Sequence, residues 1–345
     1  MINFKTPLVY IVCSAFLGAS VSYYFFHNQA IAASSSNENA QASGTSSPAN
    51  PGCNPTVAHL GGFNHVKPVL FSERDCESER LDPIKRDILS LIDSGKQQGL
   101  LSSASIYLQL FSKDEWTSIN GEEHYHPASL NKVAVMITYL HAAESNAGNL
   151  LNQKVLFEKH DKSLPDPTIL SKTLQPGQSY TIMELLHYMI AYSDNDATQL
   201  LLKHIDLNTY NKTFTDLGLP KPTSNFDESQ VTAKEYSVFM KVLYNASYLS
   251  IPASEYGTNL LTECDFKDGL LKNLPANTQI AHKFGECRYD NVYELHESGI
   301  IYVGENAYLI TIMTKGTDRK NLTEFIGHVS GLVYGMLTAP KNTYF

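Results

Sequence analysis

The sequence predicts an α/β fold of the α+β type: an antiparallel sheet built from both ends of the chain, flanked by helices, with an inserted all-helical lobe. Three observations predict it. Strand-like segments lie at both ends of the folded part, and a block of helix-like segments lies between them. The folded part, residues 80–345, is also long enough for one sizeable domain with two lobes. A small-molecule site is expected where sheet and helical lobe meet.

The first 32 residues have the pattern of a membrane anchor or a signal peptide. Lys5 precedes the almost wholly apolar run Pro7–Phe26, and about 20 apolar residues suffice to cross a bilayer. A positive charge before the run places the N-terminus inside and the rest outside. Ala30-Ile31-Ala32 also fits a cleavage site, so secretion after cleavage near Ala32 is the alternative. The length of the run favours the anchor, and both alternatives are extracytoplasmic.

Residues 33–79 are predicted to be a flexible linker. From Ala33 to Pro55 the chain is rich in Ser, Asn, Ala, Gly and Pro and has almost no large apolar side chain. Such a segment cannot bury enough surface to order itself.

The four cysteines beyond the apolar run form an even set in an oxidising compartment, which indicates two disulfides. Three connectivities are possible, and we expect the sequence-local pairs Cys53–Cys76 and Cys264–Cys287. The alternative is that the cysteines are unpaired and buried.

Composition also restricts partners and cofactors. The net charge is −9, and no basic cluster is interleaved with aromatic residues, which argues against nucleic acid. The scattered cysteines do not resemble a zinc framework, and the pair His124 and His126 lacks an evident third ligand. We therefore expect no metal and no cofactor.

The elements at the start of the domain follow from periodicity. Asp82–Lys96 carries apolar residues at helical spacing and ends near Gly99. Ala104–Leu110 alternates as a strand does, and Trp116–Ile119 is a second strand after a polar turn. A buried helix then begins at Ser129.

The helical lobe and the rest of the sheet follow. Gln175-Pro176-Gly177 predicts a turn, and Thr181 is placed to cap the strongly apolar helix Ile182–Tyr192. The remaining predicted elements are the helices Asp196–Ile205, Leu207–Leu217, Thr232–Tyr244 and Ser254–Thr262, the strands Thr278–Cys287, Gly299–Val303 and Tyr308–Thr314, and the closing helix Leu322–Leu337.

The first motif is Ser-x-x-Lys at the start of the buried helix. Residues three apart share a helix face, so Ser129 and Lys132 are expected side by side. A serine becomes a nucleophile when a neighbour takes its proton, and a lysine can do so if burial or nearby cations lower its pKa. The alternative is a helix-capping Ser129 and a surface Lys132.

The second motif is Ser193-Asp194-Asn195, at the end of the apolar helix. Ser, Asp and Asn also cap helices, and helix capping is the simpler explanation for this motif taken alone. Its position downstream of Ser-x-x-Lys, in a helical lobe, favours a functional role.

The third motif is Lys283-Phe284-Gly285 within a predicted strand. Lys267-Asp268-Gly269 also matches Lys-x-Gly but is followed by helical residues. A glycine in a strand lets a ligand backbone lie close, and an exposed strand edge can pair with a peptide.

With these three motifs in this order, the chain resembles the serine β-lactamases of class A and the penicillin-binding proteins, which carry Ser-x-x-Lys, Ser-Asp-Asn and Lys-Thr-Gly. The resemblance covers nearly all of Arg80–Phe345 and implies a β-lactamase/transpeptidase-like fold. It implies that Ser129 is the acylated nucleophile and Lys132 its proton acceptor, directly or through water. Ser193 would relay the proton to the leaving nitrogen, and the charge of Lys283 would lower the pKa of Lys132.

The resemblance also implies the binding groups. The oxyanion hole would consist of the backbone N–H groups of Ser129 and Glu286. Substrate would be bound by Asn195, through a side-chain amide of the substrate, and by the Phe284 and Gly285 positions of the third motif.

The chain departs from the family pattern at two places. The segment Gly218–Val231 is too short for the family's long loop and lacks its Glu-x-x-Leu-Asn phrase, whose glutamate activates the deacylating water. Asp227 and Glu228 are the nearby carboxylates, and they more simply precede the helix that Thr232 opens. Phe284 stands where the family has Thr or Ser, so a hydroxyl for the substrate carboxylate is missing.

These features predict a membrane-tethered serine acyl hydrolase acting on β-lactams or on D-alanyl cell-wall peptides. Acylation and deacylation need different proton acceptors, so loss of the water-activating base slows deacylation alone. The alternative is a penicillin- or peptidoglycan-binding or sensing ectodomain that does not turn over.

Overall fold

The computed structural model describes residues 53–145, 149–162, 164, 171–222, 229–340 and 344–345, and Cys53–Phe345 form one compact unit. The predicted anchor and the first part of the predicted linker lie outside the described residues, as do Asp227 and Glu228. Within the described part, no helix combines the length and the apolar character that a membrane span requires.

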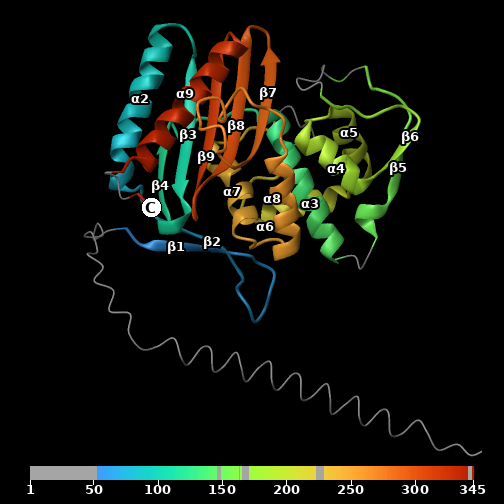
Figure 1. Cartoon of the computed structure of the whole chain (residues 1–345). Coiled ribbons are helices and arrows are strands. Elements are labelled where there is room, and N and C mark those ends of the chain that lie inside the picture. The colour runs from blue at the N-terminus through green and yellow to red at the C-terminus, as the bar shows by residue number, and fades with distance from the viewer. Residues whose placement is uncertain (1–52, 146–148, 163, 165–170, 223–228, 341–343) are drawn as a thin grey trace, which may run out of the picture. The chain divides into compact units, whose positions relative to one another are not determined.

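A five-stranded sheet with the order β4-β3-β9-β8-β7 forms the centre of the unit (Figure 1). Every neighbouring pair is antiparallel. Strand β3 from the start of the domain pairs with β9 from its end, so the sheet is built from both ends of the chain, as predicted. The strand bounds are β3 Ser103–Leu110, β4 Glu115–Ile119, β7 Ile280–Tyr289, β8 Val292–Val303 and β9 Asn306–Gly316.

Helices cover both faces of this sheet. Two terminal helices, α2 (Asp82–Gln97) and α9 (Arg319–Thr338), lie together on one face (Figure 1). On the other side lie α3 (Asn131–Ser145), α4 (Ile182–Ala191), α5 (Asn195–His204), α6 (Leu207–Asp216), α7 (Ala233–Tyr244) and α8 (Ile251–Thr262). Short elements complete the described part: β5 (Lys154–Phe157) pairs with β6 (Gln178–Thr181), and 3-10 turns occupy Glu79–Leu81 (η1), Phe111–Lys113 (η2), Ala128–Leu130 (η3) and Leu150–Asn152 (η4).

Alternation along the strands divides the interior into two cores. In β3, Ile106 and Leu108 pack into the core shared with α2 and α9, whereas Tyr107 between them packs into the core shared with α3, α4 and α7. Because both faces are covered, β3 is buried along almost its whole length. The sheet is therefore a rigid support between the two helical layers.

Two helices of the helical lobe begin with reciprocal caps. The Thr181 hydroxyl accepts from the Glu184 N–H at 3.1 Å, and the Glu184 carboxylate accepts from the Thr181 N–H at 2.7 Å. Thr232 and Glu235 form the same arrangement at the start of α7. The predicted cap at Thr181 is confirmed, and each cap satisfies donors that a helix start leaves unpaired.

A β-hairpin lies within the stretch assigned to the linker. Strands β1 (Pro55–His59) and β2 (Val69–Arg74) pair antiparallel, so the ordered part begins well before Arg80. The hairpin is joined to the domain through contacts distant in sequence: the Trp116 indole N–H donates to Arg74 O at 2.8 Å, and Lys241 Nζ donates to Glu73 Oε2 at 3.3 Å. The amino-acid composition of residues 33–79 does not reveal such contacts with distant parts of the chain.

One of the two predicted disulfides is present. Cys53 and Cys76 are bridged, as expected. The predicted Cys264–Cys287 bridge is wrong, since neither cysteine forms a disulfide. Cys264 is buried in the core after α8, whereas the partly exposed Cys287 Sγ lies 2.8 Å from the Tyr289 hydroxyl near the end of β7.

Candidate active site

Ser129 lies in the 3-10 turn η3, immediately before α3. The sequence placed it in the helix itself, but the regular helix begins at Asn131. Ala128 has φ +48°, a left-handed conformation that costs a residue with a Cβ about 1 kcal/mol or more. The turn is held on its inner side by the Tyr236 hydroxyl, which donates to Leu130 O at 3.1 Å. Ser129 is half-buried and so remains accessible.

Strand β7 passes directly beside this turn at Gly285. A Cβ on Gly285 would lie 2.5 Å from Pro127 O and 2.9 Å from the Leu130 nitrogen. Side chains alternate along a strand, so Lys283 and Gly285 share the face of β7 that meets the turn. The absence of a side chain at 285 therefore lets the main chain of β7 come close to the turn η3, called the nucleophile turn below after the role proposed for Ser129.

Lys132 lies one helical turn after Ser129, with its amine buried. Its Nζ donates to Ser193 O at 2.6 Å and to Asn195 Oδ1 at 2.8 Å. The Ser193 hydroxyl oxygen lies 3.2 Å from the same nitrogen. The first and second motifs, separated by more than sixty residues, therefore meet at one amine.

Ser193 and Asn195 occupy the break between α4 and α5. Ser193 adopts φ +54°, another left-handed position, and Asp194 caps α5 by accepting from the Ala197 N–H at 2.7 Å. Asp194 also accepts from the Leu174 N–H at 3.3 Å. Asp194 thus has the capping role expected of this residue type, and it fixes the two polar neighbours that face Lys132.

Lys283 extends from β7 to the same hydroxyl. Its Nζ donates to Ser193 Oγ at 2.9 Å and lies 4.3 Å from the centroid of the Phe284 ring. Lys283 is fully buried. The two amines and the Ser193 hydroxyl form one continuous chain of polar groups, with Asn195 bonded to Lys132.

Burial lowers the pKa of both lysines. The pKa of Lys132 lies well below its usual range, first because the amine is desolvated and then because Lys283 is nearby; Asp194 and Cys264 oppose the shift. The pKa of Lys283 is lowered to about 8 by desolvation, against opposing effects of Cys264 and two glutamates, Glu297 and Glu286. The shift of Lys132 favours its neutral form, which can accept a proton, and a pKa of about 8 leaves Lys283 mostly charged at neutral pH.

The structure does not bring Phe284 to an open surface. Its side chain is 1 % exposed and stacks on Phe266 with ring centroids 4.2 Å apart. It points into the core shared with α2 and α9, so the predicted contact between Phe284 and substrate is not available in this arrangement. Glu286, the next predicted residue, has its carboxylate paired with Arg319 Nε at 2.7 Å.

The motifs did not indicate Cys264 or Glu297. Both act to raise the pKa of Lys283, against the effect of burial, and Glu297 also accepts a 2.6 Å hydrogen bond from His282 Nδ1. Neither residue belongs to a recognisable pattern, since Cys264 follows α8 and Glu297 lies inside β8. Their proximity to the lysines arises from the tertiary fold.

The described residues offer one group of potential metal ligands, Cys53, Asp75 and Cys76, and its two cysteines are joined as a disulfide. His124 and His126 belong to no such group within the described part.

Comparisons with known proteins agree with this architecture. The model of the β-lactamase enzyme family matches residues 83–337. Among solved structures, PBP-A is 18 % identical, with a TM-score of 0.63 over 75 % of this chain and 97 % of that one. A β-lactamase from Chitinophaga pinensis is 16 % identical, with a TM-score of 0.63 over 73 % and 98 %. An ancestral class A β-lactamase is 16 % identical, with a TM-score of 0.61 over 73 % and 98 %. The comparison with curated proteins gives no match.

Proposed function

The chain belongs to the β-lactamase enzyme family, and from that premise we propose that it is a serine hydrolase that forms an acyl-enzyme at Ser129 with β-lactams or D-alanyl cell-wall peptides. The observation that carries the proposal is the pair of buried amines that lie 3.2 and 2.9 Å from the Ser193 hydroxyl oxygen. The structure of a similarly folded protein, a PBP-A mutant, is an acyl-enzyme complex with penicillin G, which supports the proposal.

Acylation begins at Ser129. Its Oγ attacks the carbonyl carbon while its proton moves to Lys132, directly or through water. Two N–H bonds of a neutral Lys132 amine donate to Ser193 O and Asn195 Oδ1, so the lone pair remains to accept a proton. The negative charge that develops on the carbonyl oxygen would be stabilised by the backbone N–H groups of Ser129 and Glu286.

The second half of acylation breaks the amide bond. Lys283 donates to Ser193 Oγ, which leaves the hydrogen of Ser193 free to be given away. Ser193 gives it to the leaving nitrogen and recovers a proton from Lys132, so that Lys132 ends neutral and Ser129 carries an ester. Lys283 stays charged, and we propose that it attracts the carboxylate of the substrate while Asn195 and the β7 edge at Gly285 hold its backbone.

Deacylation is proposed to be slow. Water must be activated to hydrolyse the ester, and the segment Gly218–Val231 lacks the family's Glu-x-x-Leu-Asn phrase. Without that base, the acyl group stays on Ser129 for many acylation half-times.

Mass measurement after exposure to penicillin tests the proposal. We expect a mass increase equal to the whole antibiotic, located on the peptide that contains Ser129. It is absent in Ser129→Ala and kept in Ser179→Ala, a control at an exposed serine of β6. Fluorescent penicillin then gives the rate at which the label is lost. Rapid cephalosporin turnover that Ser129→Ala abolishes would contradict slow deacylation.

The alternative is a penicillin- or peptidoglycan-binding or sensing ectodomain that does not turn over, either because it stays acylated or because its site is degenerate. The substitution of Phe for the family's Thr or Ser at 284 favours it, because a hydroxyl for the substrate carboxylate is missing. A wild-type protein that binds penicillin or peptidoglycan without gaining mass would support this alternative.

We further propose that residues 1–32 place the domain outside the cytoplasm, anchored by residues 7–26 or secreted after cleavage near Ala32. The N-terminal sequence of the mature protein distinguishes these two cases.

A further inference from the structure

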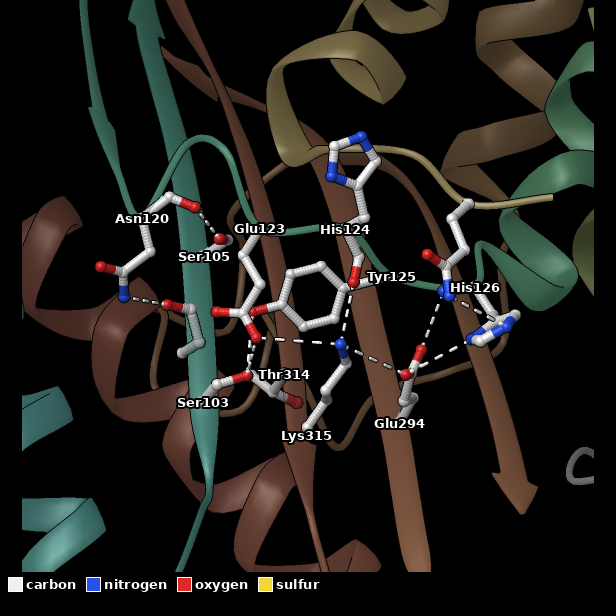
Figure 2. A network of polar contacts seen from close by, with 12 residues as sticks. Ser103, Ser105, Asn120, Glu123, His124, Tyr125, His126, Glu294, Thr314 and Lys315 are labelled. Carbon is white, nitrogen blue, oxygen red and sulfur yellow. Dashed lines mark hydrogen bonds and ion pairs between the residues drawn. The ribbon is translucent and has the colours of Figure 1, made fainter. Parts of the chain in front are cut away.

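The segment that leads into the nucleophile turn, His124–His126, is held by side chains of the sheet (Figure 2). Lys315 Nζ, from β9, donates to His124 O at 2.8 Å. Glu294 Oε2, from β8, accepts from the His126 N–H at 2.9 Å, and His296 Nε2 lies 3.1 Å from His126 O. Figure 2 shows Lys315 and Glu294 pointing toward this segment from neighbouring strands.

Main-chain bonds hold the residue in the middle of the segment. The Tyr125 N–H donates to Val231 O at 3.0 Å, and the Val231 N–H donates to Tyr125 O at 2.9 Å. Five of the six main-chain N–H and C=O groups of residues 124–126 thus bond to partners from other elements. Ser129 follows only three residues later, so the position of this segment is transmitted directly to the nucleophile turn.

The protonation state of His296 follows from its bonds. The Thr314 N–H donates to His296 Nδ1 at 3.1 Å, so that nitrogen carries the lone pair. The proton is therefore on Nε2, which faces His126 O at 3.1 Å and Glu294 Oε2 at 3.3 Å. Burial lowers the pKa of His296, in agreement with a neutral ring.

Glu294 supplies the charge at the centre of this arrangement. Burial alone would raise its pKa, but the hydrogen bonds from His296 and the His126 N–H and the charge of Lys315 outweigh that effect, and the net pKa is lowered. Lys315 Nζ lies 3.7 Å from Glu294 and 3.8 Å from Glu123. A bond from a main-chain N–H to such a carboxylate is charge-assisted and stronger than a neutral one.

The nucleophile turn requires this support because it is strained and crowded. Ala128 is left-handed, and the turn meets β7 at Gly285, where a Cβ would lie 2.5 Å from Pro127 O. Strained residues keep their conformation only where the surrounding structure over-determines it. Here β7 restrains the turn from one side and the residues before it are tied to β8 and β9.

We propose that Lys315, Glu294 and His296 form a clamp on residues 124–126 that positions Ser129 for acylation. They are positioning residues, since they act through the main chain of the segment. The expected effect on the acylation rate rests on the proposed function. The expected effect on the position of residues 124–126 rests on the hydrogen bonds alone.

Two substitutions of His296 separate the clamp from general packing. His296→Phe keeps a buried ring but removes the donor to His126 O, whereas His296→Gln keeps a donor at the ε position. Both substitutions remove the ring nitrogen that accepts from the Thr314 N–H, so both variants lose that hydrogen bond. His296→Phe should lower the acylation rate constant for fluorescent penicillin about 10- to 100-fold, because misplacing the nucleophile by about 1 Å lowers the rate by about this much. The saturation constant should change little. His296→Gln should stay within about threefold of the wild type.

Lys241→Met is the matched control for buried polar loss. Lys241 is 1 % exposed and pairs with Glu73 between α7 and β2, and its described contacts do not include residues 124–130. It should lower the melting temperature and leave the acylation rate constant unchanged. The proposal is overturned if His296→Phe acylates as fast as His296→Gln, or if Lys241→Met slows acylation equally.

Hydrogen exchange keeps this test separate from the proposed function. The peptide covering residues 124–131 should exchange faster in His296→Phe than in the wild type and should be unchanged in Lys241→Met. If penicillin never labels the wild type, the proposed function fails, while exchange still decides whether the clamp exists. Unchanged exchange in His296→Phe would overturn the clamp, whatever the labelling shows.

Discussion

Two buried lysines share one hydroxyl in the candidate site. Lys132 and Lys283 place their amines 3.2 and 2.9 Å from Ser193 Oγ, so two ammonium groups here would repel each other strongly. Burial disfavours both charges, and the more strongly shifted amine, Lys132, loses its proton first. In the proposed mechanism, this proximity suits Lys132 to accept a proton and leaves Lys283 as the remaining positive charge.

We expect acylation to fail at alkaline pH because Lys283 loses its proton. Its pKa is lowered to about 8, so its charge is present below that pH and is lost as the pH rises through it. Penicillin is an anion, and loss of the charge removes an attraction at the site. The acylation rate constant for fluorescent penicillin should therefore fall above pH 8.

The control is Lys283→Arg, because a guanidinium stays charged throughout this range. The variant should be slower overall, yet its rate should not fall near pH 8. If wild type and variant lose activity at the same pH, another group causes the decline.

At the residue scale, the sequence predicted four of the groups that meet at the site but misplaced Phe284. Ser193, Asn195 and the two lysines could be found because their types and order form motifs. Phe284 fits the same spacing, but a large ring at this position packs on Phe266 in the core. Whether a strand residue faces core or site depends on what packs against it, and here Phe266 comes from a segment with no motif.

At the element scale, the contact between β7 and the turn η3 places the third motif beside the first. Within the sheet, Gly285 pairs with His296 of β8, one of the clamp residues. The nucleophile turn is therefore joined to adjacent strands at neighbouring positions. The Lys-x-Gly spacing singled out Gly285, but only the fold shows that this glycine lets the main chains of β7 and η3 approach each other.

Gly285→Ala should impair acylation far more than stability. The new Cβ would lie 2.5 Å from Pro127 O and 2.9 Å from the Leu130 nitrogen, and both are main-chain atoms that move only with the turn. A shift of about 1 Å at the nucleophile costs about 100-fold, so we expect at least this loss in the acylation rate constant for penicillin.

Gly299→Ala serves as the comparison in the same sheet. A Cβ there would meet side-chain atoms of Leu270, Ile280 and His282 at 2.9 to 3.1 Å, away from the turn. It should lower the unfolding midpoint and leave acylation nearly unchanged. Equal loss of acylation in both variants would show that crowding anywhere in the sheet has the same effect.

Element types were easier to predict from sequence than element boundaries. The helix Leu207–Leu217 was predicted from spacing and is observed at Leu207–Asp216, whereas β8 is observed at Val292–Val303 although only Gly299–Val303 was predicted. The first half of β8 contains Glu294, His296 and Glu297, which are polar but buried through pairing with other side chains. Periodicity assigns such residues to the surface, so it shortens the strand.

At the scale of the whole molecule, the ordered part extends beyond the family domain. The family model begins at residue 83, but β1, β2 and the Cys53–Cys76 bridge precede it. Glu73 of β2 accepts from Tyr107 of β3 at 2.8 Å and from Lys241 of α7, a residue 168 positions away. Linker composition could not reveal a hairpin whose stabilising contacts come from the rest of the fold.

These contacts lead to a prediction about the disulfide. Because β2 is bonded to β3 and α7, we expect the hairpin to unfold together with the domain, so closing a loop between residues 23 apart should stabilise the whole unit by about 3 kcal/mol. Urea unfolding with and without reductant measures this difference, since Cys264 and Cys287 form no disulfide that reductant could break. The double variant Cys53→Ser with Cys76→Ser should be insensitive to reductant and match the reduced wild type. An unchanged wild-type midpoint under reductant would instead mean that the hairpin detaches before the domain unfolds, and that the contacts of Glu73 are too weak to couple them.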